Sequence, residues 1–73
     1  MLRLDHNRLT ELPSWISHFD DLDYLSASYN LLESIPQKFP KRLSCLDLAH
    51  NRLRSLSPNL AKSVPFLKEL RLH

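Results

Sequence analysis

The amino-acid sequence contains nearly the same segment twice: LRLDHNRLTEL begins at Leu2 and LDLAHNRLRSL begins at Leu46. Three asparagines mark the recurrence, because Asn7, Asn30 and Asn51 are separated by 23 and 21 residues. A period in the range of 20 to 50 residues predicts an array of stacked structural units. Each unit of such an array buries its apolar face against its neighbours, so the repeat constrains the fold more than any other feature.

Apolar residues keep fixed distances from the asparagines. The spelling LxxLxAxxNxL starts at Leu22 and LxxLxLxxNxL starts at Leu43, while a cut copy lies at either end of the chain. Alternating apolar positions predict a strand with one buried face. One strand in each unit, parallel to the strand before it, predicts a curved parallel sheet on one side and variable turns on the other.

These motifs resemble the leucine-rich repeat family over essentially all 73 residues. The resemblance implies an α/β-type solenoid, with a short parallel β-sheet on the concave side and extended, 3-10 or short helical turns on the convex side. We expect one leucine-rich-repeat segment, 1–73, belonging to a longer solenoid. Its expected parts are a truncated first repeat at 1–21, repeats at 22–42 and 43–66, and the start of a fourth at 67–73. The stretch SPNLAKSVPFL leaves room for a helical turn between Pro58 and Pro65.

The asparagines Asn7, Asn30 and Asn51 are expected to be structural. A short carboxamide can bond backbone groups that have no partner in the strand ladder. Leucine at position 30 would leave those groups bare, at roughly 1–3 kcal/mol for each buried group. The chain has no glycine, so we also expect asparagine to take up the unusual backbone angles.

If the leucines point inward, the residues between them face outward on the concave side, in rows that cross the repeats. These rows mix aromatic, basic and small side chains, a composition that suits a protein partner, although outward strand residues are often simply solvated. The expected partner-binding residues are Arg3, His6, Arg8, Tyr24, Tyr29, Asp47, His50 and Arg52.

Candidates for other chemistry are weaker. His6 and His50 are two repeats apart, about 10 Å at the usual strand spacing, which is too far to share a metal ion. Cys45 has no base placed beside it by the pattern. We therefore expect no enzyme activity, cofactor or metal within these residues. Trp15 either packs with Phe19 over the core or anchors a partner, and packing is the favoured interpretation.

The charge and the cysteine content limit which classes of partner and which cellular compartment are expected. The net charge of +2 and the dispersed basic residues give no reason to expect nucleic acid or membrane binding. The single cysteine, the absence of a signal-peptide pattern and the absence of N-glycosylation acceptors favour a cytoplasmic location.

The expected function is protein–protein interaction through the concave face, in an intracellular signalling or scaffolding protein. One alternative is the recognition arm of a larger enzyme, such as a phosphatase, kinase or ubiquitin ligase, with its catalytic domain elsewhere. Another is part of a receptor or adhesion ectodomain. No capping unit covers the terminal leucines, so self-association through the ends is also expected.

Overall fold

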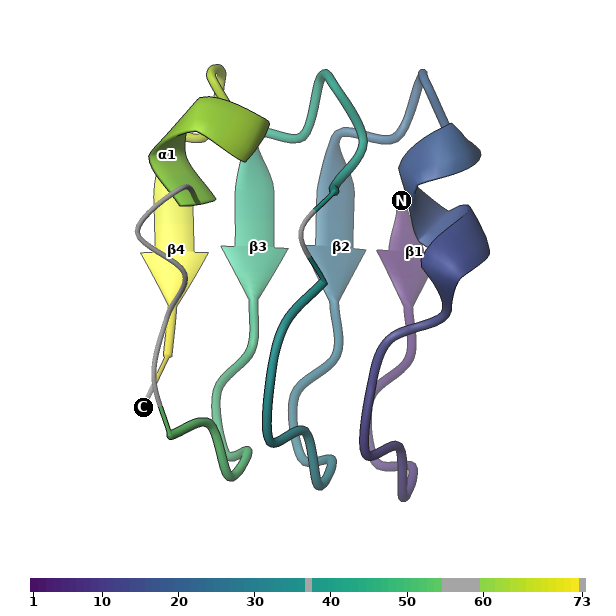
Figure 1. The fold of residues 1–73 in the computed structure, drawn as a ribbon, viewed down its shortest axis with the longest axis vertical. Helices are drawn as coiled ribbons and strands as arrows, with labels where there is room; N and C mark the ends of the chain where they lie inside the picture. The colour runs from purple at the N-terminus through teal and green to yellow at the C-terminus, as the bar shows by residue number, and fades with distance from the viewer. Residues whose placement is uncertain (37, 55–59, 73) are drawn as a thin grey trace.

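Four short parallel strands carry the architecture of the chain (Figure 1). The computed structural model describes residues 1–36, 38–54 and 60–72. The strands are β1 (Leu2–Arg3), β2 (Tyr24–Ser26), β3 (Cys45–Asp47) and β4 (Glu69–Arg71). They form one sheet in the order β1-β2-β3-β4, and each neighbouring pair is parallel. The parallel sheet expected from the alternating leucines is thus confirmed.

The register of the sheet follows the repeat. Leu2 lies opposite Leu25, Leu25 opposite Leu46, and Leu46 opposite Leu70. Equivalent positions of the motif therefore stand side by side, although the segments that join them differ in length. The differences are absorbed in the turns, because a slip of one residue in a strand would bring its leucine to the outer face.

The connecting segments cross one side of the sheet. Figure 1 shows the 3-10 helix η1 (Ser14–His18) and the helix α1 (Leu60–Ser63) on the same side, in front of the strands. Pro13 precedes η1 with a φ of −60°, and the N–H of Ile16 donates to its carbonyl at 3.2 Å, which is a bond of the 3-10 type. Helix α1 lies inside the segment where the sequence leaves room for a helical turn, but residues 55–59 are outside the described part of the chain.

The core fills the space between the sheet and the turns. Leucines from the motif and apolar residues from the turns make one buried cluster, composed of Leu12, Ile16, Leu22, Leu25, Ala27, Leu32, Phe39, Leu43, Leu46, Leu48 and Val64. This confirms that the repeated leucines point inward. Burial declines toward the last strand, where Leu70 is 36% exposed, because no further repeat packs on it in the described chain.

The expectation that asparagine takes up the unusual backbone angles is wrong. The left-handed conformation falls on the residue before each of the three asparagines of the motif: φ is 56° at His6, 55° at Tyr29 and 57° at His50. In this conformation the backbone turns out of the strand, and the next residue can direct its carboxamide back toward the turn. The backbone angle and the hydrogen bonds are therefore divided between two adjacent residues.

Candidate protein-binding surface

The eight residues expected to contact a partner lie on the strands or in the segments directly after them. Six of them have exposed side chains, namely Arg3, His6, Arg8, Tyr29, His50 and Arg52. The other two, Tyr24 and Asp47, are partly buried. All eight side chains are thus accessible to some degree, and their role in binding stays a prediction.

Three aromatic side chains from successive repeats form a continuous stack. The ring of Tyr29 lies between the rings of His6 and His50, with centroid separations of 4.5 and 4.2 Å and interplanar angles of 9° and 12°. We call these three residues the ring column. A sequence comparison places them in one row but does not show whether their rings meet, so the stack is a finding of the structure.

Backbone pairing beyond the strands explains why the rings are so close. The N–H of His6 donates to the carbonyl of Ser28, and the N–H of Tyr29 donates to that of Ala49, both at 3.0 Å. The parallel ladder therefore continues past the strand ends, where chains lie about 4.7–4.9 Å apart. Identical left-handed backbones then project the three side chains the same way. Each stacked pair is worth about 0.5–1.5 kcal/mol beyond its burial.

The asparagine that follows each residue of the column binds backbone groups with its side chain. Asn30 donates to the carbonyls of Leu4, Ala27 and Ser28 at 2.9, 3.0 and 3.1 Å. Its side-chain oxygen accepts the N–H of Leu9 at 3.2 Å. Asn51 repeats this pattern one repeat further on, and the described bonds of Asn7 stay within its own turn. The bonds of Asn30 and Asn51 therefore hold the second and third left-handed turns to the turn of the preceding repeat.

A carboxylate fills the gap between two serines on the outer side of the sheet. Ser26 and Ser28 alternate with the buried Leu25 and Ala27 and so belong to the outward rows, yet they are only 3% and 8% exposed. Oδ1 of Asp5 accepts hydrogen bonds from the hydroxyls of Ser26 and Ser28, at 2.6 and 3.0 Å, and from the N–H of Ser28 at 2.8 Å. Partial burial acts to raise the pKa of Asp5, but these hydrogen bonds outweigh it and lower the pKa below its usual value.

Charged contacts also cross the outer side of the sheet. The guanidinium of Arg3 lies 5.9 Å from the ring centre of Tyr24, at the outer limit of a cation–π contact. On β4, Arg71 donates to Oε1 of Glu69 through both Nε and a terminal nitrogen, at 3.1 and 2.9 Å. Both side chains of that pair are more than half exposed, so it contributes little to stability.

Cys45 has an acidic neighbour that sequence reasoning missed. Its thiol donates to Oε2 of Glu69 at 3.4 Å, across the β3–β4 pair. Burial and this carboxylate both raise the pKa of the thiol, which keeps it protonated. The contact therefore corrects the statement that no base lies beside Cys45, and it makes the sulfur a poorer nucleophile rather than a better one.

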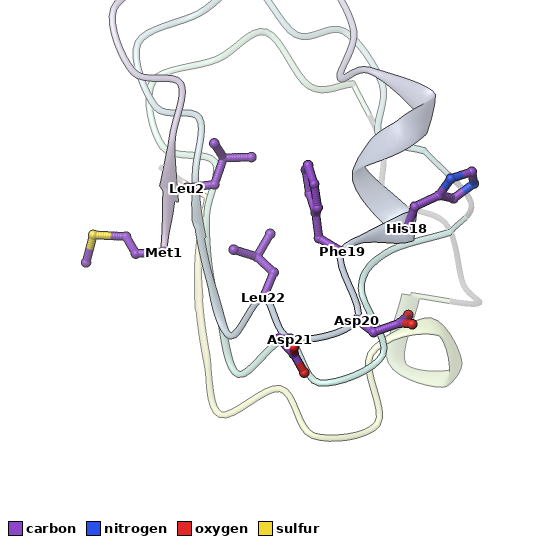
Figure 2. A pocket seen from close by; sticks show the side chains of 7 residues that line it. All are labelled: Met1, Leu2, His18, Phe19, Asp20, Asp21 and Leu22. Carbon is purple, nitrogen blue, oxygen red and sulfur yellow. The ribbon is translucent and has the colours of Figure 1, made fainter.

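An open hollow of about 560 Å³ lies between β1 and the end of η1 (Figure 2). Figure 2 shows Leu2, Phe19 and Leu22 directed into the hollow, whereas Met1 points away from it. Its floor is thus the apolar core at the first repeat.

Trp15 contacts Phe19 edge to face, with the two ring centroids 5.4 Å apart. Both rings remain exposed, so Trp15 packs on its neighbour outside the core.

Other types of site find no support in the part of the chain that the structure describes. Within residues 1–36, 38–54 and 60–72, no group of three or more His, Cys, Asp or Glu side chains is arranged to hold a metal ion. No helix among the same residues is both long enough and apolar enough to cross a bilayer.

Comparison with known proteins identifies relatives of very different size. The chain is 34% identical to pig (Sus scrofa) fibromodulin over 71 residues, covering 97% of the chain and 48% of fibromodulin. It is 36% identical over 58 residues to human (Homo sapiens) podocan-like protein 1 and, equally, to a probable serine/threonine-protein kinase of Dictyostelium discoideum. Each of these two matches covers 75% of the chain, but only 11% and 5% of the respective relative. The chain thus spans at most about half the length of these relatives.

No solved structure is significantly similar to the chain. The family model described as Leucine Rich Repeat matches residues 1–19 and 42–63, which together make up more than half of the chain. These two segments contain the repeated motif around Asn7 and Asn51. Their strands, β1 and β3, each pair with β2, which lies between them, in the register that the repeat requires. The chain belongs to the leucine-rich repeat family.

Proposed function

We propose that this chain binds a protein partner through the concave, strand-bearing face of its repeats. Leucine-rich repeats are generally modules of protein–protein interaction and are typically not catalytic. One observation carries the proposal for this chain: the inward leucines of the strands recur, whereas the outward residue beside them differs between repeats. It is an exposed arginine at Arg3, a buried serine at Ser26 and a partly buried carboxylate at Asp47. Such a surface is individual to the chain, as selective recognition requires.

The wider role of this module is a second step of the proposal. An intracellular signalling or scaffolding protein is one context for it. The recognition arm of a larger enzyme is another, supported by the match to a probable serine/threonine-protein kinase. The matches to fibromodulin and podocan-like protein 1 support neither context, and the comparisons do not favour the cytoplasm over an extracellular location.

Site-specific photo-crosslinking tests the proposed face. A photoreactive phenylalanine analogue placed at Tyr24 would lie on the sheet, and the same analogue placed at Trp15 would lie on η1, on the opposite side. Both positions carry aromatic side chains already, which makes the two variants a matched pair. We expect a crosslinked partner from position 24 and a much weaker signal from position 15. Crosslinking confined to position 15 would refute the assignment of the face.

A substitution series completes the test once a crosslinked partner is in hand. Tyr24 can be changed to alanine, because β2 is extended there. Tyr29 and His50 are better changed to asparagine, since their backbones are left-handed and asparagine adopts that conformation readily. We expect the triple variant to lose binding of the crosslinked partner and to keep its far-ultraviolet circular dichroism spectrum.

A further inference from the structure

The central ring of the column presents its edge to solvent rather than its flat faces. Both faces of Tyr29 are covered, one by His6 and the other by His50, with nearly parallel rings. Tyr29 nevertheless remains 49% exposed, so its accessible atoms belong to the ring edge and the hydroxyl. A partner approaching this point meets a phenol O–H between two imidazoles, which offer N–H donors at their edges. The column therefore suits hydrogen-bond acceptors better than apolar side chains.

Two exposed arginines follow the end residues of the column in the sequence. Arg8 and Arg52 follow His6 and His50 by two residues, and both side chains are exposed. Neither guanidinium forms an ion pair with another residue of the described chain. Leu31 holds the equivalent position between them and adds no opposing charge.

The acidic groups near the column are already engaged. Asp5, which precedes His6, accepts three hydrogen bonds from Ser26 and Ser28. An oxygen of Asp47, three residues before His50, accepts the N–H of Ala49 at 3.1 Å. One oxygen of each of these carboxylates is thus held by hydrogen bonds within the chain, whereas the guanidinium groups of Arg8 and Arg52 form no ion pair in the described chain, which favours an anionic ligand.

The spacing of the column fits an extended chain. Successive ring centres are 4.5 and 4.2 Å apart along a line that crosses the repeats. Alternate residues of an extended peptide lie about 7 Å apart on one face. Two carboxylates at alternate positions would thus reach the two ends of the column, His6 and His50, each of which is followed two residues later by an exposed arginine.

We propose that the ring column, together with Arg8 and Arg52, is a docking strip for an acidic peptide segment with carboxylates at alternate positions. This inference rests on the proposed function and names the chemistry of the partner. The segment lies across the repeats, and its carboxylates accept hydrogen bonds from the ring edges and the guanidinium groups.

Fluorescence anisotropy with synthetic peptides tests the strip. The probe is a fluorescein-labelled decapeptide of alternating glutamate and alanine, and its control replaces every glutamate with glutamine. We expect the full chain to bind the glutamate peptide about tenfold more tightly than the glutamine peptide, and added salt to reduce the difference. Equal affinity for the two peptides, or none for either, would overturn the proposal.

Substitutions distinguish binding at this strip from binding that depends only on the net charge of the chain. Arg8→Gln combined with Arg52→Gln should weaken binding of the glutamate peptide about tenfold. Lys41→Gln combined with Arg42→Gln removes the same charge from the exposed turn before β3, at the other end of the strand, and should change binding less than about twofold. Tyr29→Phe keeps the stack and removes the hydroxyl, so a loss of about threefold is expected. Equal losses from the two double variants would show that only net charge matters and would overturn the strip.

Three outcomes separate this inference from its alternatives. Tighter binding of single-stranded DNA than of the glutamate peptide would overturn the acidic-peptide assignment in favour of nucleic acid. Crosslinking from position 24 without peptide binding would overturn the strip and leave the proposed function standing. Loss of both signals, in a chain that keeps its circular dichroism spectrum, would overturn both.

Discussion

The side-chain oxygen of Asn30 accepts a hydrogen bond from the backbone N–H of Leu9, 21 residues earlier in the chain, at 3.2 Å. Its nitrogen also reaches the carbonyl of Leu4 in that earlier repeat. One carboxamide thus ties two repeats together at the point where the backbone leaves the strand. Because Asn30 is only 4% exposed, water cannot take over these bonds. The asparagine therefore holds the repeats together alongside the sheet.

Replacing Asn30 with leucine should unfold or severely destabilise the chain. The change leaves one N–H and three carbonyls without their side-chain partner, at roughly 1–3 kcal/mol for each group that becomes buried and unsatisfied. Asn7→Leu is the matched control, because Asn7 is exposed and water can replace its bonds. Its cost should stay below about 1 kcal/mol. Urea denaturation followed by circular dichroism measures both, and equal costs would contradict the bridging role.

Substitution of the equivalent leucine should reduce the stability by different amounts in different repeats. Leu46→Ala removes a fully buried side chain from β3 and should cost about 2–5 kcal/mol in the free energy of unfolding. Leu70→Ala changes the equivalent residue of β4, which is 36% exposed, and should cost less than half as much. Thermal or urea unfolding of the two variants checks this. A larger cost at position 70 would show that the last strand is covered in solution.

Acid should weaken the fold partly through Asp5. Its folded-state pKa lies below the usual value, so its ionised form is bound more favourably in the folded chain than in the unfolded one. That contribution is fully present above about pH 4 and is lost as the pH falls through the folded-state pKa. We expect Asp5→Asn to be less stable than the parent chain at neutral pH, and the difference to shrink at low pH. Asp23→Asn, at an exposed position, is the control and should lower the stability at neutral pH less than Asp5→Asn does.

The thiol of Cys45 should react slowly with iodoacetamide. Burial is the main cause of its raised pKa, and the carboxylate of Glu69 adds to the effect. Glu69→Gln removes the negative charge, lowers the thiol pKa and should accelerate alkylation at mildly alkaline pH. Glu33→Gln removes an exposed carboxylate elsewhere and should leave the rate unchanged. Mass spectrometry of the alkylated chain gives the rates, and an unchanged rate in the Glu69 variant would show that the thiol and the carboxylate do not meet in solution.

The spacing of the leucines was sufficient to predict the parallel sheet and its core. Leu25 and Leu46 alternate with polar residues, and only one arrangement buries every such leucine while keeping the repeats in step. The accessible rows were predictable for the same reason. Sequence position alone did not predict that Ser26 and Ser28 would be covered, because that depends on the reach of Asp5 from a neighbouring repeat.

The left-handed turns were assigned one residue too late. Asparagine is among the residues that tolerate positive φ best, and in a chain without glycine it looked the obvious choice. However, the carboxamide of Asn30 can reach Leu4, Ala27 and Ser28 only if the turn has already been made at Tyr29. The recurrence of His or Tyr before Asn7, Asn30 and Asn51 was the available signal, since histidine is also enriched at such positions.

The positive φ of Tyr29 gives the last prediction. Tyr29→Ala and Tyr29→Asn both remove the stack with His6 and His50, so both should destabilise the chain. Asparagine adopts the left-handed conformation at lower cost than alanine, and the Asn variant should therefore be more stable than the Ala variant by about 0.5–1 kcal/mol. Tyr24 provides the control because it lies in the extended strand β2, where asparagine has no such advantage. Urea midpoints of the four variants decide the point, and an Ala variant as stable as the Asn variant at position 29 would mean that the turn is not left-handed in solution.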